Sequence, residues 1–224
     1  MAAFVAILRK DLRLELRGGE STITLVALSL LILVVMVFAL NPAGGARDAG
    51  TAAGALWVAL IFSGTIGATR VLAAENGNGC LRALLLSPAD RATLYCAKMV
   101  AAFIFMAVAE IAAVVIMVLF FNLDFDARLA RLTPVLALGA LGFAALATLL
   151  AAISGRVRAG DLLLPLLAVP LFVPALIAGV KASGAALAGE PVAAFAEWLK
   201  ILIAFDVLFL SAGYLLFEHV IGED

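Results

Sequence analysis

Thr22–Leu40 is a run of nineteen residues without a charged side chain, and five further long apolar stretches follow it. A helix needs about 20 predominantly apolar residues to cross the hydrocarbon core of a membrane. Inside that core the backbone polar groups must pair within the chain, so each stretch is expected to be a transmembrane helix. The other five expected spans are Ala52–Ala74, Ala97–Phe121, Leu132–Ser154, Leu162–Val180 and Trp198–Phe217.

The composition agrees with a membrane protein and excludes several other classes. Hydrophobic residues make up 66% of the 224 residues and charged residues 14%, whereas a soluble domain carries about 25% charged residues. This balance excludes a soluble enzyme and a disordered chain, and a net charge of −1 leaves no basic footprint for nucleic acid. We expect an all-α polytopic membrane protein with a single transmembrane domain over residues 1–224.

Residues 1–21 are expected to form an N-terminal helix in the membrane interface. Phe4, Ile7, Leu8 and Leu12 recur at helical spacing, and the basic residues of the segment fall mainly on other faces. Such a helix buries its apolar face among the lipids and directs its cations towards anionic headgroups. A plain orientation signal is the alternative interpretation.

The distribution of lysine and arginine predicts the orientation of the spans. Ten basic residues fall on one side of the six-span arrangement and five on the other. Cytoplasmic loops carry the excess of these residues in membrane proteins, so both termini are predicted to lie in the cytoplasm. Arg128 and Arg131 lie on the minority side, in a loop that also carries Asp124 and Asp126.

Residues 75–92 are expected to form a cytoplasmic segment that contains a short apolar helix. The helix covers Cys80–Leu86 and presents Leu81, Leu84 and Leu85 on one face. It is too short to span the membrane and too apolar to lie free in water, and an amphipathic helix of this kind suits a groove on a partner protein. An interfacial loop is the alternative.

Three patterns predict where helices begin. Ser87 is a candidate N-cap with Pro88 at the first helical position, and Thr133 with Pro134 repeats this pair. Asp161 is the candidate cap of the fifth span. A helix from Pro88 to Phe121 would be about 50 Å long, so its first two turns should extend into the cytoplasm.

Small residues and prolines predict how the spans pack and bend. Small side chains allow helices to approach closely, and prolines inside a helix bend it. The small residues are Gly64, Gly67 and Ala68 in the second span and Gly139, Ala140, Gly142 and Ala144 in the fourth, and the prolines of the fifth span are Pro165, Pro170 and Pro174.

A short external helix is also expected near Ala193–Trp198, in the loop Lys181–Glu197.

Arg70, Glu110 and Asp206 are the charged residues that form a candidate polar pathway inside the membrane. A charge at the bilayer centre costs at least a few kcal/mol, so Glu110 and Asp206 should face the bundle interior. No basic residue lies at matching depth, which favours protonation or hydrogen bonds to Ser or Thr over ion pairs. Both a functional and a structural role remain open. Arg70, near the end of its span, could equally extend to the membrane surface.

The cysteines and the single histidine give no metal or cofactor site. Cys80 and Cys96 stand sixteen residues apart without a CxxC pair, and His219 lies near the C-terminus. Such spacing fits neither a zinc site nor haem attachment. We therefore expect no cofactor bound by this chain alone.

Several stretches resemble one family of permeases. The run Gly79-Cys80-Leu81-Arg82-Ala83-Leu84-Leu85-Leu86-Ser87-Pro88, with Lys98 after it, is similar to the Gly-x-Leu-Glu-x-Leu-Leu-Leu-Ser-Pro…Lys signature of the CcmB family. Arg9–Arg17, Leu56–Ala59 and the proline-rich Leu163–Gly179 look like other parts of that family. CcmB is the permease subunit of the cytochrome c-type haem export system, an ABC-2 type transporter. One position departs from the pattern, because Arg82 stands where the family usually has an acid.

The resemblance implies that transport and ATP hydrolysis are carried out by separate subunits. The permease is not itself catalytic, and the sequence contains no GxxxxGK[ST] phosphate-binding motif. A separate ATPase subunit would hydrolyse ATP and dock on a coupling helix. The residues carried over for this contact are Gly79, Leu81, Arg82, Leu84, Leu85, Ser87 and Pro88.

Further partners follow from the same resemblance: a haem-handling membrane subunit, a periplasmic haem chaperone, a second copy of the permease and membrane lipid, with the chain in the bacterial inner membrane. Haem is the expected cargo, although ATP could instead drive release of the loaded chaperone. The main alternative is an ABC-2 permease that exports another amphipathic substrate, such as a lipid, a glycan or a drug. A membrane enzyme of another class or a purely structural subunit are further alternatives.

Overall fold

The computed structural model describes residues 2–18, 20–40, 48–77, 90–123, 126–154 and 160–222. Within these ranges the chain is helical apart from short connections, which confirms the predicted all-helical class. The helices are α1 (Ala2–Gly18), α2 (Glu20–Leu40), α3 (Ala49–Gly77), α5 (Arg91–Phe121), α6 (Ala127–Ser154), α7 (Gly160–Leu187) and α8 (Val192–Gly222).

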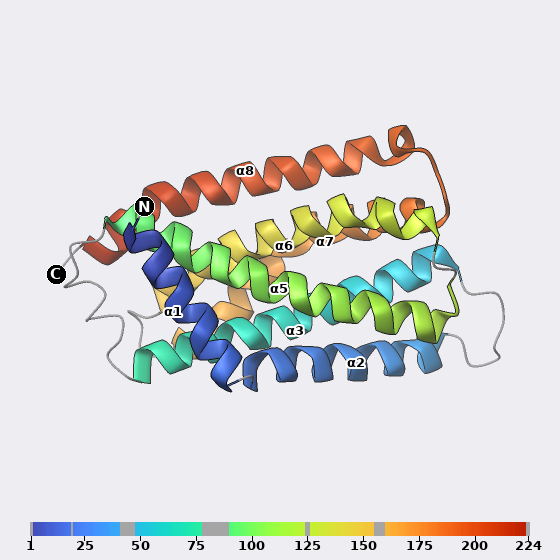
Figure 1. Cartoon of the computed structure of the whole chain (residues 1–224). Coiled ribbons are helices and arrows are strands. Elements are labelled where there is room, and N and C mark those ends of the chain that lie inside the picture. The colour runs from blue at the N-terminus through green and yellow to red at the C-terminus, as the bar shows by residue number, and fades with distance from the viewer. Residues whose placement is uncertain are drawn as a thin grey trace.

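The helices α2 to α8 form an elongated bundle, and α1 lies across it at one end (Figure 1). The start of α1 and the end of α8 lie at the end of the bundle that carries α1. The turns that join α5 to α6 and α7 to α8 lie at the opposite end. This arrangement agrees with an even number of membrane crossings after α1.

Five of the described helices carry stretches long and apolar enough to cross a membrane: Ile23–Leu40, Arg91–Phe121, Arg128–Ser154, Leu166–Leu187 and Val192–Phe217. In α3 the described apolar stretch, Ala49–Thr65, is shorter. The chain is therefore a multi-pass membrane protein by the length and composition of its helices. The count of six spans stays a prediction.

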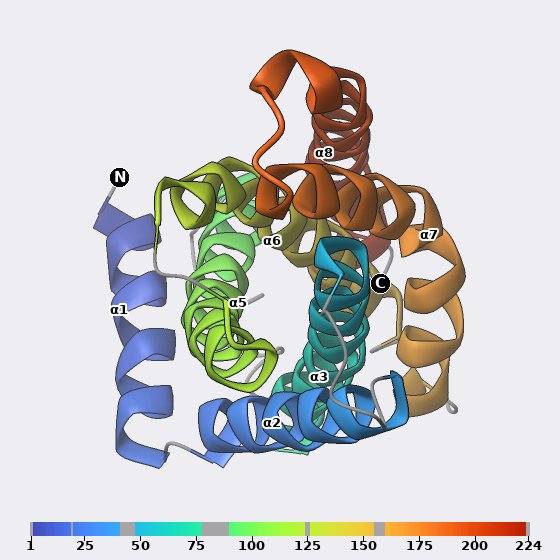
Figure 2. The same ribbon diagram turned by 90° about the vertical axis from the view of Figure 1, so that its right-hand side faces the viewer.

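Helix α6 occupies the centre of the bundle. It packs against α5, α7 and α8 and more lightly against α3, and the end-on view shows it enclosed by its neighbours (Figure 2). About two thirds of its span is buried, against 22% of the spans of α2 and α8. The outer helices instead expose large apolar side chains such as Phe38, Ile111 and Leu208, as expected where lipid replaces water.

Two helix starts are set by aspartates. Asp48 precedes α3 and its Oδ2 accepts a hydrogen bond from the backbone N–H of Thr51 at 3.2 Å. Asp126 precedes α6 and its Oδ1 accepts one from the N–H of Arg128 at 2.8 Å. Each carboxylate occupies the N-cap position and satisfies an N–H group that has no partner within the helix.

Three predicted boundaries were wrong. Thr133 is not a cap, because Asp126 starts α6 two turns earlier and Pro134 lies inside the helix. Asp161 does not precede its helix, since α7 already begins at Gly160. The expected external helix near 193–198 is not a separate element, because α7 continues to Leu187 and α8 begins at Val192.

Helix α7 changes direction along its length in the end-on view (Figure 2). Pro170 and Pro174 lie within it, and a proline inside a helix removes one backbone hydrogen bond and introduces a clash. The bend predicted from the spacing of these prolines is therefore present.

Candidate functional site

Glu110 and Asp206 are both buried, as their positions inside the spans predicted. Glu110 lies on α5 with 5% of its surface exposed, and Asp206 lies on α8 with 4% exposed. No hydrogen bond or ion pair joins these two acids to each other. The structure therefore brings both into the bundle interior, but does not bring them together.

Asp206 packs directly over Gly142 of α6. A Cβ atom added at Gly142 would lie 2.5 Å from Oδ1 of Asp206 and 2.8 Å from a ring carbon of Phe205. Glycine is required here because any larger residue would displace these side chains. The close packing predicted at Gly142 is therefore present. The group that packs against this glycine is the carboxyl group of Asp206, not the backbone of a neighbouring helix.

Both carboxylate oxygens of Asp206 are shielded from solvent and have no hydrogen-bond partner among the described residues. Of the two alternatives predicted for this residue, protonation or a hydrogen bond to Ser or Thr, the described residues provide no such hydrogen bond. An ionised carboxylate in such surroundings would carry a large desolvation cost, which a neutral carboxylic acid avoids.

The predicted coupling segment falls largely outside the described residues. Gly79, Leu81, Arg82, Leu84, Leu85, Ser87 and Pro88 all lie there, and so does the side chain of Arg70, whose backbone belongs to α3.

One prediction for this segment is corrected by the start of α5. The helix begins at Arg91 rather than at Pro88, because Asp90 at the N-cap is extended, with φ −57° and ψ 137°. Aspartate is a common N-cap residue, although here its side chain makes no capping hydrogen bond.

A small cluster of buried apolar side chains joins α1 to the bundle near the start of α5. Ile7 of α1 is buried with Leu94 and Tyr95 of α5, Ala145 of α6 and Phe217 of α8. The hydroxyl group of Tyr95 lies 3.3 Å from the carbonyl oxygen of Ala145 and 3.4 Å from that of Phe209. Tyr95 therefore connects three helices near the start of α5.

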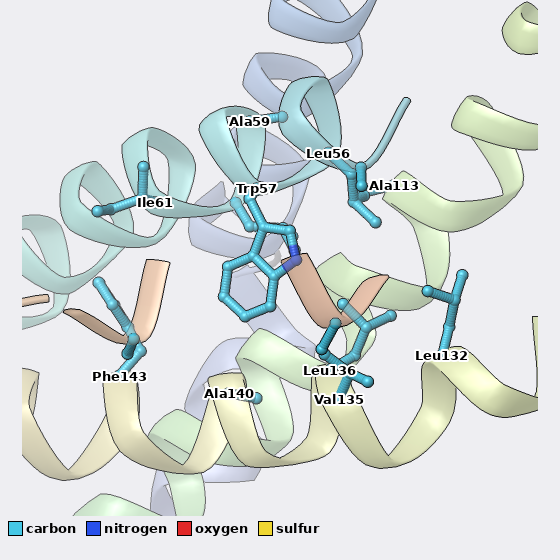
Figure 3. Close-up of a cluster of buried hydrophobic side chains, with 14 of the residues drawn as sticks. Leu56, Trp57, Ala59, Ile61, Ala113, Leu132, Val135, Leu136, Ala140 and Phe143 are labelled. Carbon is cyan, nitrogen blue, oxygen red and sulfur yellow. The ribbon is translucent and has the colours of Figure 1, made fainter. Parts of the chain in front are cut away.

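Sequence analysis missed the role of Trp57, whose indole ring is the largest fully buried side chain. The ring extends from α3 towards α6 and lies above Ala140 and Leu136 (Figure 3). A Cβ atom at either Gly139 of α6 or Gly179 of α7 would overlap this ring. These residues come from three separate helices, so the sequence carries no local signal of this packing.

A pair of serines links α2 to α3 in the same interior. The Oγ of Ser29 lies 3.0 Å from the Oγ of Ser63, and each Oγ lies within hydrogen-bond distance of a carbonyl oxygen one turn earlier in its own helix. Hydroxyl groups in a membrane interior need such partners, because lipid offers none.

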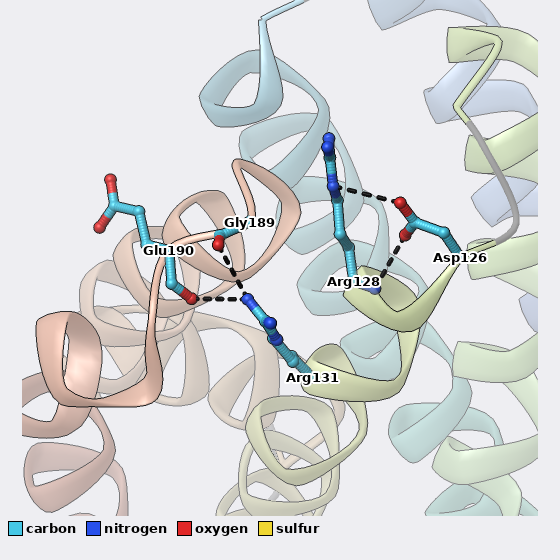
Figure 4. Close-up of polar contacts among 5 residues, drawn as sticks. All are labelled: Asp126, Arg128, Arg131, Gly189 and Glu190. Atoms are coloured by element: carbon cyan, nitrogen blue, oxygen red, sulfur yellow. Dashed lines mark hydrogen bonds and ion pairs between the residues drawn. The ribbon is translucent and has the colours of Figure 1, made fainter.

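Arg131 contacts the turn between α7 and α8. One guanidinium nitrogen, Nη1, donates to the carbonyl oxygens of Gly189 and Glu190 at 2.9 and 2.8 Å (Figure 4). These carbonyls lie in the turn after α7, where Gly189 adopts a positive φ of 81°. Arg128 instead pairs with Asp126 at 3.2 Å in an exposed position.

An apolar cavity of about 320 Å³ opens between α2, α3 and α7. Its lining includes Met36, Gly54, Val58, Leu176 and Val180. Within the part of the chain that the structure describes, no group of three His, Cys, Asp or Glu side chains is placed to hold a metal ion.

Buried acids, a hydroxyl pair between two helices and long apolar helices with a lipid-compatible exterior indicate a multi-pass helical membrane protein. The sequence matches the family model described as CcmB protein over residues 2–219. The chain belongs to the CcmB family.

Named relatives agree with this membership. The chain is 29% identical over 214 residues to Heme exporter protein B of Bradyrhizobium diazoefficiens, with 95% of this chain and 94% of the relative covered. It is 31% identical over 176 residues to Heme exporter protein B of Rhodobacter capsulatus, with 79% and 80% covered. The protein of the same name from Paracoccus denitrificans is 30% identical over 200 residues, with 89% and 91% covered.

Proposed function

We propose that this chain is the transmembrane permease subunit of an ABC transporter for haem export or haem-chaperone release in c-type cytochrome maturation. One observation carries the proposal: the likeness to proteins named Heme exporter protein B extends over 95% of this chain and 94% of the relative. The likeness therefore covers most of both chains rather than one shared segment. Its long apolar helices supply the membrane-spanning part that a permease requires.

The chain is not itself catalytic in this proposal. ATP is hydrolysed by a partner ATPase subunit that docks on residues 79–88, with Leu81, Leu84 and Leu85 as the apolar face. Ser87 and Pro88 end the docking helix, while Gly79 begins it and Arg82 contributes a charge. An apolar helix seated in a groove is a common mode of recognition between proteins, which supports this assignment.

The remaining partners are a haem-handling membrane subunit, a periplasmic haem chaperone and a second copy of the permease. The complex lies in the bacterial inner membrane with both termini of this chain in the cytoplasm. The start of α1 and the end of α8 lie at the same end of the bundle, which supports placement of both termini on one side of the membrane. Haem is the cargo of the complex or of its chaperone.

Arg70, Glu110 and Asp206 form the polar pathway of the permease in this proposal. Burial of Glu110 and Asp206 supports it, because buried acids in membrane helices are costly and commonly serve transport. Asp206 supports it most strongly, since a carboxyl group without a partner adds nothing to the stability of the bundle.

Complementation tests the proposal. Under this proposal, a bacterial strain that lacks its own haem exporter protein B forms no cytochrome c with covalently attached haem, and peroxidase staining of membrane proteins by their haem reveals this loss. Expression of this chain together with its neighbouring transport genes is expected to restore staining. Export of an unrelated substrate without haem-stained cytochromes would contradict haem export and favour another cargo.

A further inference from the structure

Helix α1 has one principal partner in the bundle, which is α5. It packs mainly on α5 and only slightly on α2, and it crosses the start of α5 in Figure 1. Ile7 of α1 and Leu94 of α5 share one buried cluster. Asp11 lies one turn beyond Ile7, and Lys98 lies one turn beyond Leu94, so the next turn of each helix brings a charged residue to the same contact.

Asp11 and Lys98 form an ion pair at this contact. The Nζ of Lys98 lies 3.0 Å from Oδ2 of Asp11, and the side chains are 14% and 12% exposed. Oδ2 is shielded from solvent. A charge pair this far from water loses much more when one partner is removed than an exposed pair does, because the remaining charge stays buried.

The contact of Lys10 with Asp11 differs from that of Lys98 in exposure and in the helices it joins. Its Nζ lies 3.2 Å from the other oxygen of Asp11, but its side chain is 36% exposed. Lys10 and Asp11 are neighbours on α1, so their contact cannot join two helices. Of the two lysine contacts with Asp11, the one made by Lys98 joins α1 to another helix.

Lys98 lies near the start of α5, which begins at Arg91. Seven residues of helix separate the two positions, a rise of about 10 Å. The segment proposed to dock on the ATPase, residues 79–88, immediately precedes this start. A shift or tilt of the start of α5 therefore reaches Lys98 through about two helical turns.

We propose that Asp11 and Lys98 are positioning residues that couple α1 to the ATPase-docking segment, so that α1 moves with the start of α5 when the ATPase changes state. This inference rests on the proposed function of residues 79–88. The pair acts by holding two helices together and touches neither ATP nor cargo. Its loss separates ATP hydrolysis from haem delivery, whereas a merely structural pair would affect both equally.

The test uses the intact complex of permease, ATPase and partner subunits in membranes. Asp11→Asn and Lys98→Met are each compared with Lys10→Met, which removes a lysine from the same carboxylate without separating the helices. The amount of permease, the recovery of the ATPase subunit, ATP hydrolysis and haem-stained cytochrome c are measured for each. The ratio of cytochrome c formed to ATP hydrolysed is the deciding quantity.

Asp11→Asn and Lys98→Met are expected to keep the ATPase bound and active while this ratio falls about fivefold or more, the lower end of typical coupling between sites. Lys10→Met and the conservative Lys98→Arg should stay close to wild type. The double exchange Asp11→Lys with Lys98→Asp restores opposite charges and should recover the ratio. If a single variant fails to accumulate, the double exchange decides the question.

An unchanged ratio in both single variants would overturn the inference, as would a double exchange that accumulates without recovering the ratio. Loss of the ATPase from Asp11→Asn would also overturn it, because the pair would then serve docking instead. Failure of the proposed function has a different signature: the wild-type chain would restore no cytochrome c, or charged variants of residues 79–88 would retain the ATPase.

Discussion

The indole Nε1 of Trp57 donates a hydrogen bond to the Oγ of Ser183 at a distance of 2.9 Å, and both residues are buried. The bond joins α3 to α7 across 126 residues of chain. The ring itself occupies space that Gly139 and Gly179 leave open. Three helices are thus fixed by one side chain, which combines a large apolar surface with one satisfied polar atom.

Gly179→Ala is expected to destabilise the protein, because the new methyl group would overlap the ring of Trp57. Overpacking of this kind costs about 1–3 kcal/mol. Gly54→Ala is the matched control, since a Cβ atom there meets nothing within 4 Å. The apparent Tm of the purified protein in detergent should fall for Gly179→Ala and stay near wild type for Gly54→Ala. Equal Tm values would show that the ring is not confined.

Arg131→Met is expected to weaken the turn between α7 and α8. The change removes two hydrogen bonds to backbone carbonyls, and a hydrogen bond from a charged group contributes about 1.5–3 kcal/mol. Arg128→Met is the comparison, because it removes an exposed ion pair that contributes about 0–1 kcal/mol. Protease cleavage near Gly189 should accelerate for Arg131→Met alone. Equal acceleration in both variants would argue against a role of the carbonyl contacts.

Asp206→Asn is expected to leave stability nearly unchanged while it lowers haem-stained cytochrome c. The amide has the shape of the carboxyl group, and the site already lacks a hydrogen-bond partner, so little structural contribution is lost. A titratable acid is nevertheless removed from the proposed pathway. Normal cytochrome c at normal Tm would exclude Asp206 from that pathway, and a large fall in Tm would indicate a structural role.

Topology is tested with reporter fusions. Fusions at Gly45, Asp126 and Gly189 should report the periplasm, and fusions at Gly79 and Gly160 the cytoplasm, because the ten-to-five distribution of basic residues places both termini inside. The contact between Arg131 and Gly189 already requires the two turns to share one side. A reversed pattern would contradict the orientation, and a split between Asp126 and Gly189 would contradict the fold.

The sequence predicted the helices well because apolar length alone identifies a segment that spans lipid. Burial of Glu110 and Asp206 was predictable for the same reason, since charges avoid lipid wherever they lie. Helix starts were harder. The run after Asp126 contains Arg128 and Arg131, so its polarity resembled a loop, although Asp126 caps a helix there.

Contacts between helices that are distant in the chain could not be predicted from the sequence. Nothing in the spacing of Trp57, Gly139, Gly179 and Ser183 shows that they meet, because an apolar helix is nearly uniform around its circumference and its buried face carries no distinct pattern. The same holds for Asp11 and Lys98, which are 87 residues apart in the chain. Such pairs emerge from packing rather than from local pattern.

Docking of a separate ATPase on residues 79–88 is the central claim about how this permease works. Leu84→Asp places a charge on the predicted apolar face, where burial of a leucine contributes about 1.5–3 kcal/mol and a buried charge adds a desolvation cost. Ala83→Asp carries the same charge on the opposite face and serves as the control. No membrane span is altered by either change, so both variants should insert normally.

The deciding measurement is recovery of the ATPase subunit with affinity-purified permease from membranes that contain equal amounts of each variant. We predict that Leu84→Asp loses the ATPase while Ala83→Asp retains it. Undiminished recovery of the ATPase with membrane-inserted Leu84→Asp would contradict the docking role of this segment.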